Sequence, residues 1–572
     1  MKGGFVAVVA VLLYCSGAHG FDLPLVDDIP EGTPAEAVVH IDTGTVYGKV
    51  NDSGRVFQGI PFAGPPTKQN RFMPPVPREP WYPQKLEAIN FGPGCPQDCV
   101  LPPLTCPEVV DEDCLFLSVY TPRLDSITEP LPVMVFFPGG DYIQGTSQCL
   151  LYQGSALVNE TNTILVVTNY RLGALGFLTN DELSGNYGQL DQVASLQWVQ
   201  RNIAQFGGDP NRVTLFGQSA GGMSTVAHIV SPASYGLFQN GIVESNPLAL
   251  GFNTFDYQKR TSDIFASSAG CGDLSGTAKS LCLRNLTADE VIAAQAVADA
   301  RPDPDLFIEI FTPWTPIVDG SALIPGQPTE LFRKGMFNPV NMMAGSVTDE
   351  AWMFIWFVAP FPIPAPLYDQ LTRLVFGADA DAVLEVYPVK RTDLDTRPEL
   401  NDMLTDYLFL CPTRDVGRSF NTQRPELEFY KYRYNHVLSF YDAWGPDYEF
   451  CWFDYVCHAA ELPFVFQTAG LGGFTYEADE LTLSNSMIGY WANFAHSGTP
   501  NSGPGDKYID VNWPQYTASG RMEMDLNLTI AGVHDVHADK CDFWDTIGYN
   551  QFGDSLRDAL LFLYHEQHPH AT

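Results

Sequence analysis

Short, uninterrupted runs of apolar residues in the middle of the chain most strongly limit how this sequence can fold. Three of them occupy residues 133–137, 164–167 and 213–216. Strands that are apolar at every position are buried on both faces, as in a parallel sheet covered by helices. Residues 191–205 carry a helical pattern, with one apolar face formed by Val193, Leu196, Val199 and Ile203. The sequence therefore predicts an α/β fold around a central, mostly parallel sheet.

The length of 572 residues would allow several domains, but the chain shows no internal repeat, low-complexity block or dividing linker. Its proline-rich stretches, near residues 60–110 and 358–366, are interleaved with large apolar residues, unlike a flexible spacer. The composition, 45% hydrophobic and 17% charged, supplies a large core. We expect one domain spanning residues 21–572.

The N-terminus has the composition of a targeting signal rather than of a folded segment. Lys2 precedes an apolar run at residues 5–14, and small residues end at Ala18-His19-Gly20. This pattern predicts a cleavable secretory signal over residues 1–20, too short to anchor the chain in a bilayer. The mature protein is expected to be secreted, extracellular and without a membrane anchor.

The net charge of −36 excludes two classes of partner. Nucleic acids and anionic membrane surfaces bind to basic patches, which a chain with 31 basic and 67 acidic residues is poorly suited to form. A cationic ligand or partner is compatible with this charge, although a solubilising surface is the commoner reason for such acidity.

The third apolar run leads directly into G-Q-S-A-G-G at residues 217–222. This is the G-x-S-x-G pattern in its required setting, between a buried strand and a helix. A sharp turn there holds the hydroxyl of Ser219 clear of the sheet, and small neighbours avoid clashes in the strained backbone. The helix that follows favours developing negative charge. An incidental serine in a glycine-rich turn is the competing interpretation, which the flanking elements disfavour.

With these motifs the chain resembles the type-B carboxylesterase/cholinesterase family of α/β-hydrolases over roughly residues 35–548. The resemblance rests also on E-D-C-L at 112–115, N-Y-R-L-G at 169–173, N-I-A-Q-F-G-G-D-P at 202–210 and W-A-N-F-A at 491–495. It implies an α/β-hydrolase fold and hydrolysis of a small-molecule ester through an acyl-enzyme. Such chemistry needs no metal ion and no organic cofactor.

A serine nucleophile needs a histidine base oriented by a carboxylate, in the chain order Ser, acid, His. By resemblance, Glu350 in G-S-V-T-D-E at 345–350 is the acid, and adjacent Asp349 is the alternative. His458 in H-A-A-E-L at 458–462 matches the motif of the base. His228 is interpreted as a packed helix residue. His565, His568 and His570 are interpreted as a disordered tail.

The oxyanion hole is where the sequence departs from its relatives. They typically carry three small residues after the first strand run, whereas this chain has P-G-G-D at 138–141. The backbone N–H groups of Gly140, Asp141 and Ala220 are the expected donors, and backbone donors survive a side-chain change. An ionised Asp141 pointing inward would weaken catalysis, and one pointing outward would be harmless.

Two features argue against a specialist for choline esters. Cholinesterases carry a tryptophan that binds quaternary ammonium in the loop ending at the E-D-C motif, and residues 95–114 contain none. The residue before the nucleophile, glutamate in cholinesterases, is Gln218 here. Neutral carboxylic esters are the expected substrates. The aromatic segment 351–358 either lines a gorge or packs as a buried helix, the second being slightly favoured.

Eleven of the 12 cysteines remain once Cys15 of the signal is removed, so at least one is left without an intramolecular partner. The resemblance implies the pairs Cys95–Cys114, Cys271–Cys282 and Cys411–Cys541. Proximity in sequence suggests Cys99–Cys106 and Cys451–Cys457, which leaves Cys149 free. Glycosylation sequons stand at Asn51, Asn159, Asn285 and Asn527.

The competing functional hypothesis is a catalytically silent adhesion or binding protein on the same fold. The family includes such members, neuroligins and neurotactin among them, and these commonly lack one or more triad residues. Retention of Ser219, Glu350 and His458 favours a serine carboxylesterase, while Asp141 and the acidity keep the alternative open. The sequence does not indicate an oligomeric state.

Overall fold

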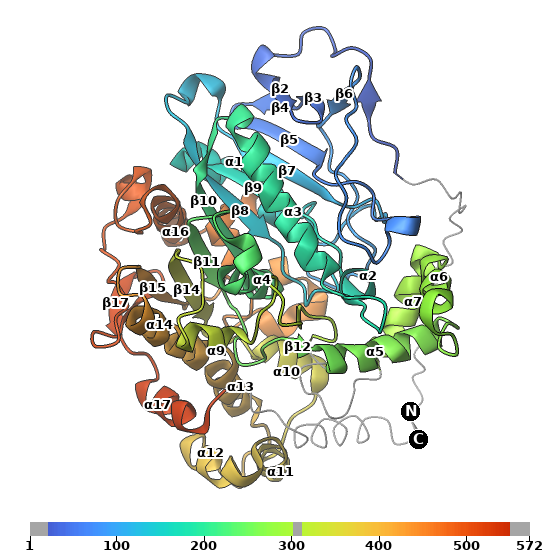
Figure 1. Ribbon diagram of the computed structural model, residues 1–572. Helices are drawn as coiled ribbons and strands as arrows, with labels where there is room; N and C mark the ends of the chain where they lie inside the picture. The colour runs from blue at the N-terminus through green and yellow to red at the C-terminus, as the bar shows by residue number, and fades with distance from the viewer. Residues whose placement is uncertain (1–20, 301–311, 550–572) are drawn as a thin grey trace, which may run out of the picture.

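The structure, a computed structural model, describes residues 21–300 and 312–549. The expected signal at 1–20 and the histidines of the C-terminal tail lie outside these ranges. Within them, an eleven-stranded sheet has the order β17-β16-β15-β14-β11-β10-β8-β9-β7-β5-β4 (Figure 1). Its strands are β4 (Lys49–Asn51), β5 (Gly54–Pro61), β7 (Phe116–Thr121), β8 (Leu131–Phe137), β9 (Ile164–Thr168), β10 (Gly208–Gln218), β11 (Asn240–Glu244), β14 (Asn341–Val347), β15 (Phe429–Tyr434), β16 (Met522–Leu526) and β17 (Ala531–His534).

The sheet is mostly parallel, as expected, but not purely so, because antiparallel pairs lie toward both of its edges. The pairs from β9 through β8, β10, β11, β14 and β15 to β16 are parallel. The pairs β4–β5, β5–β7, β7–β9 and β16–β17 are antiparallel. β5 and β7 are buried along their whole length. Continuous burial therefore does not reveal strand direction here.

Helices lie on both faces of the sheet, and Figure 1 shows α3 and α4 crossing one of them. The helices are α1 (Ser155–Thr161), α2 (Gly173–Phe177), α3 (Tyr187–Asn202), α4 (Ala220–Val230), α5 (Phe255–Ser268), α6 (Gly276–Arg284), α7 (Ala288–Asp299), α9 (Pro328–Arg333), α10 (Trp352–Val358), α11 (Ala365–Phe376), α12 (Ala380–Val386), α13 (Arg397–Thr405), α14 (Cys411–Gln423), α15 (Leu462–Phe466), α16 (Ala478–Ser497) and α17 (Ala538–Ile547). Two small sheets, β1-β6-β3-β2 and β12-β13, complete the described part. Their strands are β1 (Leu25–Val26), β2 (Val38–Ile41), β3 (Gly44–Tyr47), β6 (Lys85–Glu87), β12 (Asn253–Thr254) and β13 (Ile317–Val318).

Alternate residues of the central strands enter two separate cores. Val133 and Val135 of β8 pack in a cluster that contains residues of α3 and α4. Met134 and Phe136, which alternate with them along β8, pack in a second cluster that contains residues of α15 and α16. Burying both faces in this way fixes the central strands, and so fixes the loops that leave their carboxyl ends.

The predicted helix at 191–205 begins earlier and ends earlier than its apolar pattern. α3 runs from Tyr187 to Asn202, and a 3-10 turn covers Ile203–Phe206. Its first turns carry polar residues that are buried rather than exposed, and Gln189 hydrogen-bonds to His228 at 2.9 Å. The periodic pattern of apolar residues does not reveal where α3 begins, because its first turn is buried through polar contacts.

The structure contains the five disulfides named from the sequence and a buried, unbonded Cys149. Cys99–Cys106 closes a small surface loop, and Cys451–Cys457 closes the segment just before His458. Of the sequon asparagines, Asn51, Asn159 and Asn285 are exposed and Asn527 is partly exposed.

Candidate active site

Ser219 occupies a strained turn between β10 and α4. Its backbone has φ 60° and ψ −124°, a conformation that non-glycine residues rarely adopt. A Cβ at position 221 would lie 2.0 Å from the carbonyl oxygen of Phe137, so only glycine fits there. The turn is held by the N–H of Ser219, which donates to the carbonyl oxygen of Glu244 at 2.9 Å. The strand-turn-helix setting expected of the motif is present.

Glu350 and His458 are brought together from loops that follow β14 and β15. Nδ1 of His458 hydrogen-bonds to Oε2 of Glu350, a fully buried carboxylate. Oε1 of Glu350 accepts from the N–H of Val347 at 2.8 Å. Both carboxylate oxygens are therefore occupied, which holds the imidazole ring in one orientation.

The other ring nitrogen of His458 contacts Gln218, a relationship that the sequence did not predict. The side-chain amide Nε2 of Gln218 donates to Nε2 of His458 at 3.1 Å. Because an amide N–H only donates, Nε2 of the ring is the acceptor and Nδ1 carries the proton toward Glu350. Within the described part of the chain, no hydrogen bond joins the hydroxyl of Ser219 to the ring.

Burial lowers the pKa of His458, but the charge and hydrogen bond of Glu350 outweigh it, so the pKa is raised above its ordinary 6.5. Glu461 and Asp141 add to the rise. The buried carboxylate of Glu350 thus strengthens the basicity of the His458 imidazole.

Asp349, the alternative acid, serves a different contact. Its Oδ2 accepts from the N–H of Val456 at 2.8 Å, and its Oδ1 accepts from the amide of Asn401 at 2.8 Å. Asp349 therefore tethers the segment that precedes His458 and has no hydrogen bond to the imidazole among the described contacts. The two neighbouring carboxylates therefore have different contacts: Glu350 binds the imidazole ring of His458, and Asp349 binds the backbone of the segment before it.

Three backbone N–H groups at or near Ser219 lack a protein acceptor: two belong to residues that line the same cavity, and one to the residue that follows Ser219. Those of Gly140, Asp141 and Ala220 donate to no protein atom in the described part of the chain. Gly140 and Asp141 have positive φ angles of 113° and 54°, and the N–H groups of Ile143 and Gln144 both donate to the carbonyl oxygen of Gly140. Unused donors thus belong to residues that line the cavity with Ser219 or adjoin it, as the expected oxyanion hole requires.

A neighbouring loop braces this turn, a feature that the sequence did not reveal. The side chain of Gln97 both donates to the carbonyl of Gly145 at 3.0 Å and accepts from its N–H at 2.8 Å. Oε1 of Gln144 accepts from the N–H of Val100 at 2.9 Å. The Cys99–Cys106 loop and the turn at residues 140–145 are therefore fixed to each other.

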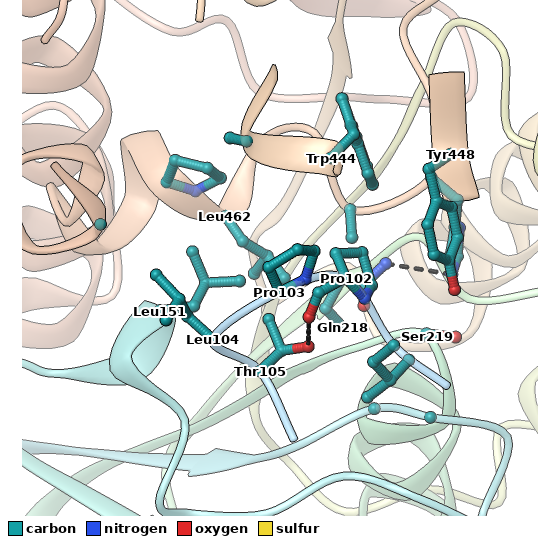
Figure 2. Close-up of a pocket in the computed structure, with 18 of the residues that line it drawn as sticks. Pro102, Pro103, Leu104, Thr105, Leu151, Gln218, Ser219, Trp444, Tyr448 and Leu462 are labelled. Carbon is teal, nitrogen blue, oxygen red and sulfur yellow. Dashed lines mark hydrogen bonds between the residues drawn. The ribbon is translucent and has the colours of Figure 1, made fainter. Parts of the chain in front are cut away.

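A cavity of about 190 Å³ opens onto Ser219 and His458, and its wall is mostly apolar. Figure 2 shows Ser219 and Gln218 in the same cavity as Pro102, Pro103 and Leu104 of the Cys99–Cys106 loop, with Trp444 and Tyr448 on its wall. Its apolar lining includes Leu101, Pro102, Pro103, Leu104, Leu151, Met353, Phe354, Phe357, Leu438, Phe440, Trp444, Leu462 and Phe474. We call this space the large lobe.

A second space of about 20 Å³ adjoins the same two residues, and we call it the small lobe. It is lined by Met223, Pro247, Leu250, Ala351, Phe354, Leu404, Leu408 and Phe409, together with Asp141, Ser219, Thr312 and His458. Ser219 thus lines both a roomy and a confined apolar space. An acyl group and an alcohol of unequal size fit this arrangement.

The aromatic segment 351–358 fulfils both interpretations weighed from the sequence. It forms α10, whose Trp352, Met353 and Ile355 are buried. Phe354 and Phe357 line the large lobe, as does Met353. The helix packs on the core with one side and faces the cavity with the other.

His228 is fully buried in α4 and hydrogen-bonds to Gln189, Gln192 and Ser234. Burial lowers its pKa to about 3, so it stays neutral as a packed helix residue. Over residues 21–300 and 312–549, no group of three His, Cys, Asp or Glu side chains is placed to hold a metal ion. No helix in the same ranges is long and apolar enough to cross a membrane.

Comparisons with known proteins agree with this geometry. A model of the carboxylesterase family matches residues 35–544. The crystal protein of Dictyostelium discoideum is 37% identical over 90% of this chain and 92% of its own length. The cocaine esterase of Homo sapiens is 33% identical over 88% of this chain and 90% of its own. The acylcarnitine hydrolase of Mus musculus is 32% identical over 88% of both. The chain therefore belongs to the carboxylesterase family and is a carboxylic ester hydrolase with an α/β-hydrolase fold.

Proposed function

We propose that this protein is a secreted serine carboxylesterase that hydrolyses neutral carboxylic esters, with Ser219, His458 and Glu350 as its catalytic triad. The hydrogen bond between Glu350 and His458, beside a cavity that also contains Ser219, is the observation that carries the proposal. We further propose that residues 21–572 form one catalytic domain and that residues 1–20 are removed on secretion.

In the first half of the reaction, Ser219 attacks the ester carbonyl while Nε2 of His458 takes the hydroxyl proton. The ring must exchange its contact with Gln218 for one with Ser219, a small displacement within the cavity. Glu350 stabilises the imidazolium that forms, and the N–H groups of Gly140, Asp141 and Ala220 hold the oxyanion. His458 then returns the proton to the alcohol as the carbon–oxygen bond breaks.

In the second half, water attacks the acyl-enzyme with His458 again as base, and the acid leaves with Ser219 regenerated. No metal ion or organic cofactor takes part in these steps. The apolar walls of the large lobe favour a substrate with an extended apolar group. The five disulfides support the proposed secreted location because disulfides persist in oxidising compartments. The exposed sequons at Asn51, Asn159 and Asn285 support glycosylation there, with Asn527 as the partly exposed fourth.

The test compares wild type and Ser219→Ala on p-nitrophenyl acetate and p-nitrophenyl butyrate, with folding verified by circular dichroism. Turnover by wild type that disappears in Ser219→Ala is the expected result. Ser519→Ala, at an exposed serine outside the cavity, is the matched control and is expected to keep full activity. Equal rates in wild type and Ser219→Ala would contradict the proposal and favour a silent binding protein.

A further inference from the structure

The charge of the cavity wall comes from a single acidic residue. Asp141 lines both the large and the small lobe, together with Ser219 and His458. Among the described residues that line the two lobes there is no other Asp or Glu and no Lys or Arg. A charged group on a bound ester would therefore meet the Asp141 carboxyl and no compensating cation of the wall.

The Asp141 carboxyl has no protein partner of its own. In the described part of the chain, neither a hydrogen bond nor an ion pair reaches it, and its electrostatic neighbour is His458. Asp191, a fully buried carboxylate, shows the usual solution, a bidentate ion pair with Arg171. An unpaired carboxyl in an apolar cavity is costly to keep unless a ligand completes it.

Besides His458, whose two ring nitrogens are engaged by Gln218 and Glu350, two titratable groups face Asp141. They are Tyr170 and Tyr448. The hydroxyl of Tyr170 donates to the carbonyl of Pro138 at 2.7 Å. That of Tyr448 donates to the carbonyl of Val100, also at 2.7 Å. Both protons are engaged elsewhere, which leaves the bound molecule as the source of a donor or a positive charge.

The backbone holds Asp141 in place. Its φ of 54° lies in the left-handed region, which Asp and Asn tolerate better than most residues. The turn on either side is tied by the two N–H groups that donate to Gly140 and by the Gln97–Gly145 pair. The position of the carboxyl therefore follows from a braced loop, and an Asn at 141 would keep both the backbone and the shape.

We propose that Asp141 is a specificity-determining residue that selects esters by charge. It favours substrates with a cationic group near the ester linkage over neutral esters of the same shape, and it rejects those with an anionic group there. The inference rests on the proposed esterase function of the same cavity and extends its substrate class from neutral to cationic esters. The net charge of −36 acts in the same direction by raising the local concentration of cations.

The ionisation of Asp141 gives the selectivity a dependence on pH. Burial raises the pKa of Asp141 to about 6, and the positive charge that His458 can carry opposes that rise. The carboxyl is mainly ionised at pH 7.5 and mainly neutral at pH 5. Charge selection should therefore be strong at the higher pH and weak at the lower one.

The experiment measures kcat/KM for three butyrate esters of matched size. Their alcohols are 2-(trimethylammonio)ethanol, 3,3-dimethylbutanol and 3-carboxy-3-methylbutanol, which are cationic, neutral and anionic. At pH 7.5 we expect the ratio of kcat/KM for the cationic ester to that for the neutral ester to be roughly tenfold higher in wild type than in Asp141→Asn. We expect the same factor for the ratio of the neutral to the anionic ester. Asp447→Asn, at an exposed acid beside Tyr448, is the control for surface charge and should keep the wild-type ratios.

The ratio of kcat/KM for the cationic ester to that for the neutral ester should approach, in wild type at pH 5, the ratio in Asp141→Asn. Protonation of Asp141 removes the same charge, and neither of these two esters titrates. This arm needs no variant and decides the question if Asp141→Asn folds poorly. A cationic-to-neutral ratio that is equal in wild type and Asp141→Asn, or that does not change between pH 5 and 7.5, would overturn the proposal while leaving the esterase function intact. Absence of Ser219-dependent turnover for all three esters would overturn both.

Discussion

The side-chain amide of Gln218 donates a hydrogen bond to Nε2 of His458 at 3.1 Å. In the proposed mechanism, Ser219 needs the same ring nitrogen to accept its hydroxyl proton. Together with the contact between Nδ1 and Glu350, this bond fixes both nitrogens of one buried imidazole. The amide of Gln218 donates to the unprotonated nitrogen and so favours the neutral ring, whereas Glu350 favours the charged ring and raises the pKa of His458.

Gln218→Glu should move the acid limb of the kcat/KM profile to higher pH. A carboxylate beside Nε2 favours the imidazolium and raises the pKa of His458 further. Since the base must be neutral, activity is lost as pH falls through this raised pKa. Rates on a neutral ester between pH 5 and 9 measure the shift. Gln515→Glu, at an exposed position, should leave the limb in place. An unmoved limb in Gln218→Glu would show that the contact does not control the base.

Glu350→Gln and Asp349→Asn should have opposite signatures. The first removes the orienting carboxylate and lets an amide donate to Nδ1, which selects the wrong tautomer and should lower kcat by roughly a thousandfold or more. The second leaves the ring contact intact but mismatches the tether to Val456 and Asn401. It should lower the free energy of unfolding by about 1–3 kcal/mol with a far smaller change in kcat. The reverse pattern would make Asp349 the catalytic acid.

The Cys451–Cys457 disulfide should support the position of His458, which directly follows it in sequence. Replacing both cysteines by alanine is expected to lower the free energy of unfolding by roughly 2 kcal/mol and to lower kcat more than it raises KM. The matched control is Cys271→Ala with Cys282→Ala, a bond outside the cavity lining. It should lose stability without losing kcat, and an equal loss of kcat in both pairs would argue against a specific role for Cys451–Cys457.

A buried carboxyl behind the triad should make stability depend on pH. Oε1 of Glu244 accepts from the indole of Trp491 at 2.6 Å, while its Oε2 has no partner among the described residues. Burial, followed by the charge of Glu461, raises the pKa of Glu244 from 4.5 to about 8. The folded state therefore keeps a proton that the unfolded chain releases, and stability is lost as pH rises through this window.

Glu244→Gln replaces the titratable carboxyl group by an amide of nearly the same shape, which does not titrate. Its Tm should exceed that of wild type at pH 8 by more than it does at pH 5. Thermal unfolding followed by circular dichroism at the two values measures the difference, with Glu385→Gln as an exposed control. A difference between variant and wild type that is the same at both pH values would contradict an anomalous Glu244.

Much of the fold was predictable because burial leaves a direct trace in sequence. The run at 213–216 lies within β10, and the segment 351–358 is α10 but for its first residue, since both bury apolar side chains. Strand direction left no such trace, because β5 and β7 are as buried as their parallel neighbours. The start of α3 was missed because Gln189 is buried through a hydrogen bond rather than through apolar contact.

The site followed the same division. The positions of Ser219, Glu350 and His458 were indicated by local motifs. Ser219 and Glu350 closely follow the ends of β10 and β14, whereas His458 lies at the end of a long segment after β15. The different contacts of Asp349 and Glu350 depend on where the segment before His458 passes, which only the tertiary structure gives. The contact between Gln218 and His458 joins residues 240 apart, and no local pattern encodes it.

The most direct test of the account is covalent labelling of the proposed nucleophile. A fluorophosphonate transfers its phosphonyl group to an activated serine and loses fluoride, and peptide mass spectrometry then locates the added group. We predict labelling on Ser219 alone, with loss of esterase activity in step with labelling, and greatly slowed labelling in His458→Ala. Labelling at another serine, or full activity with Ser219 fully modified, would contradict the assignment of Ser219 as the nucleophile.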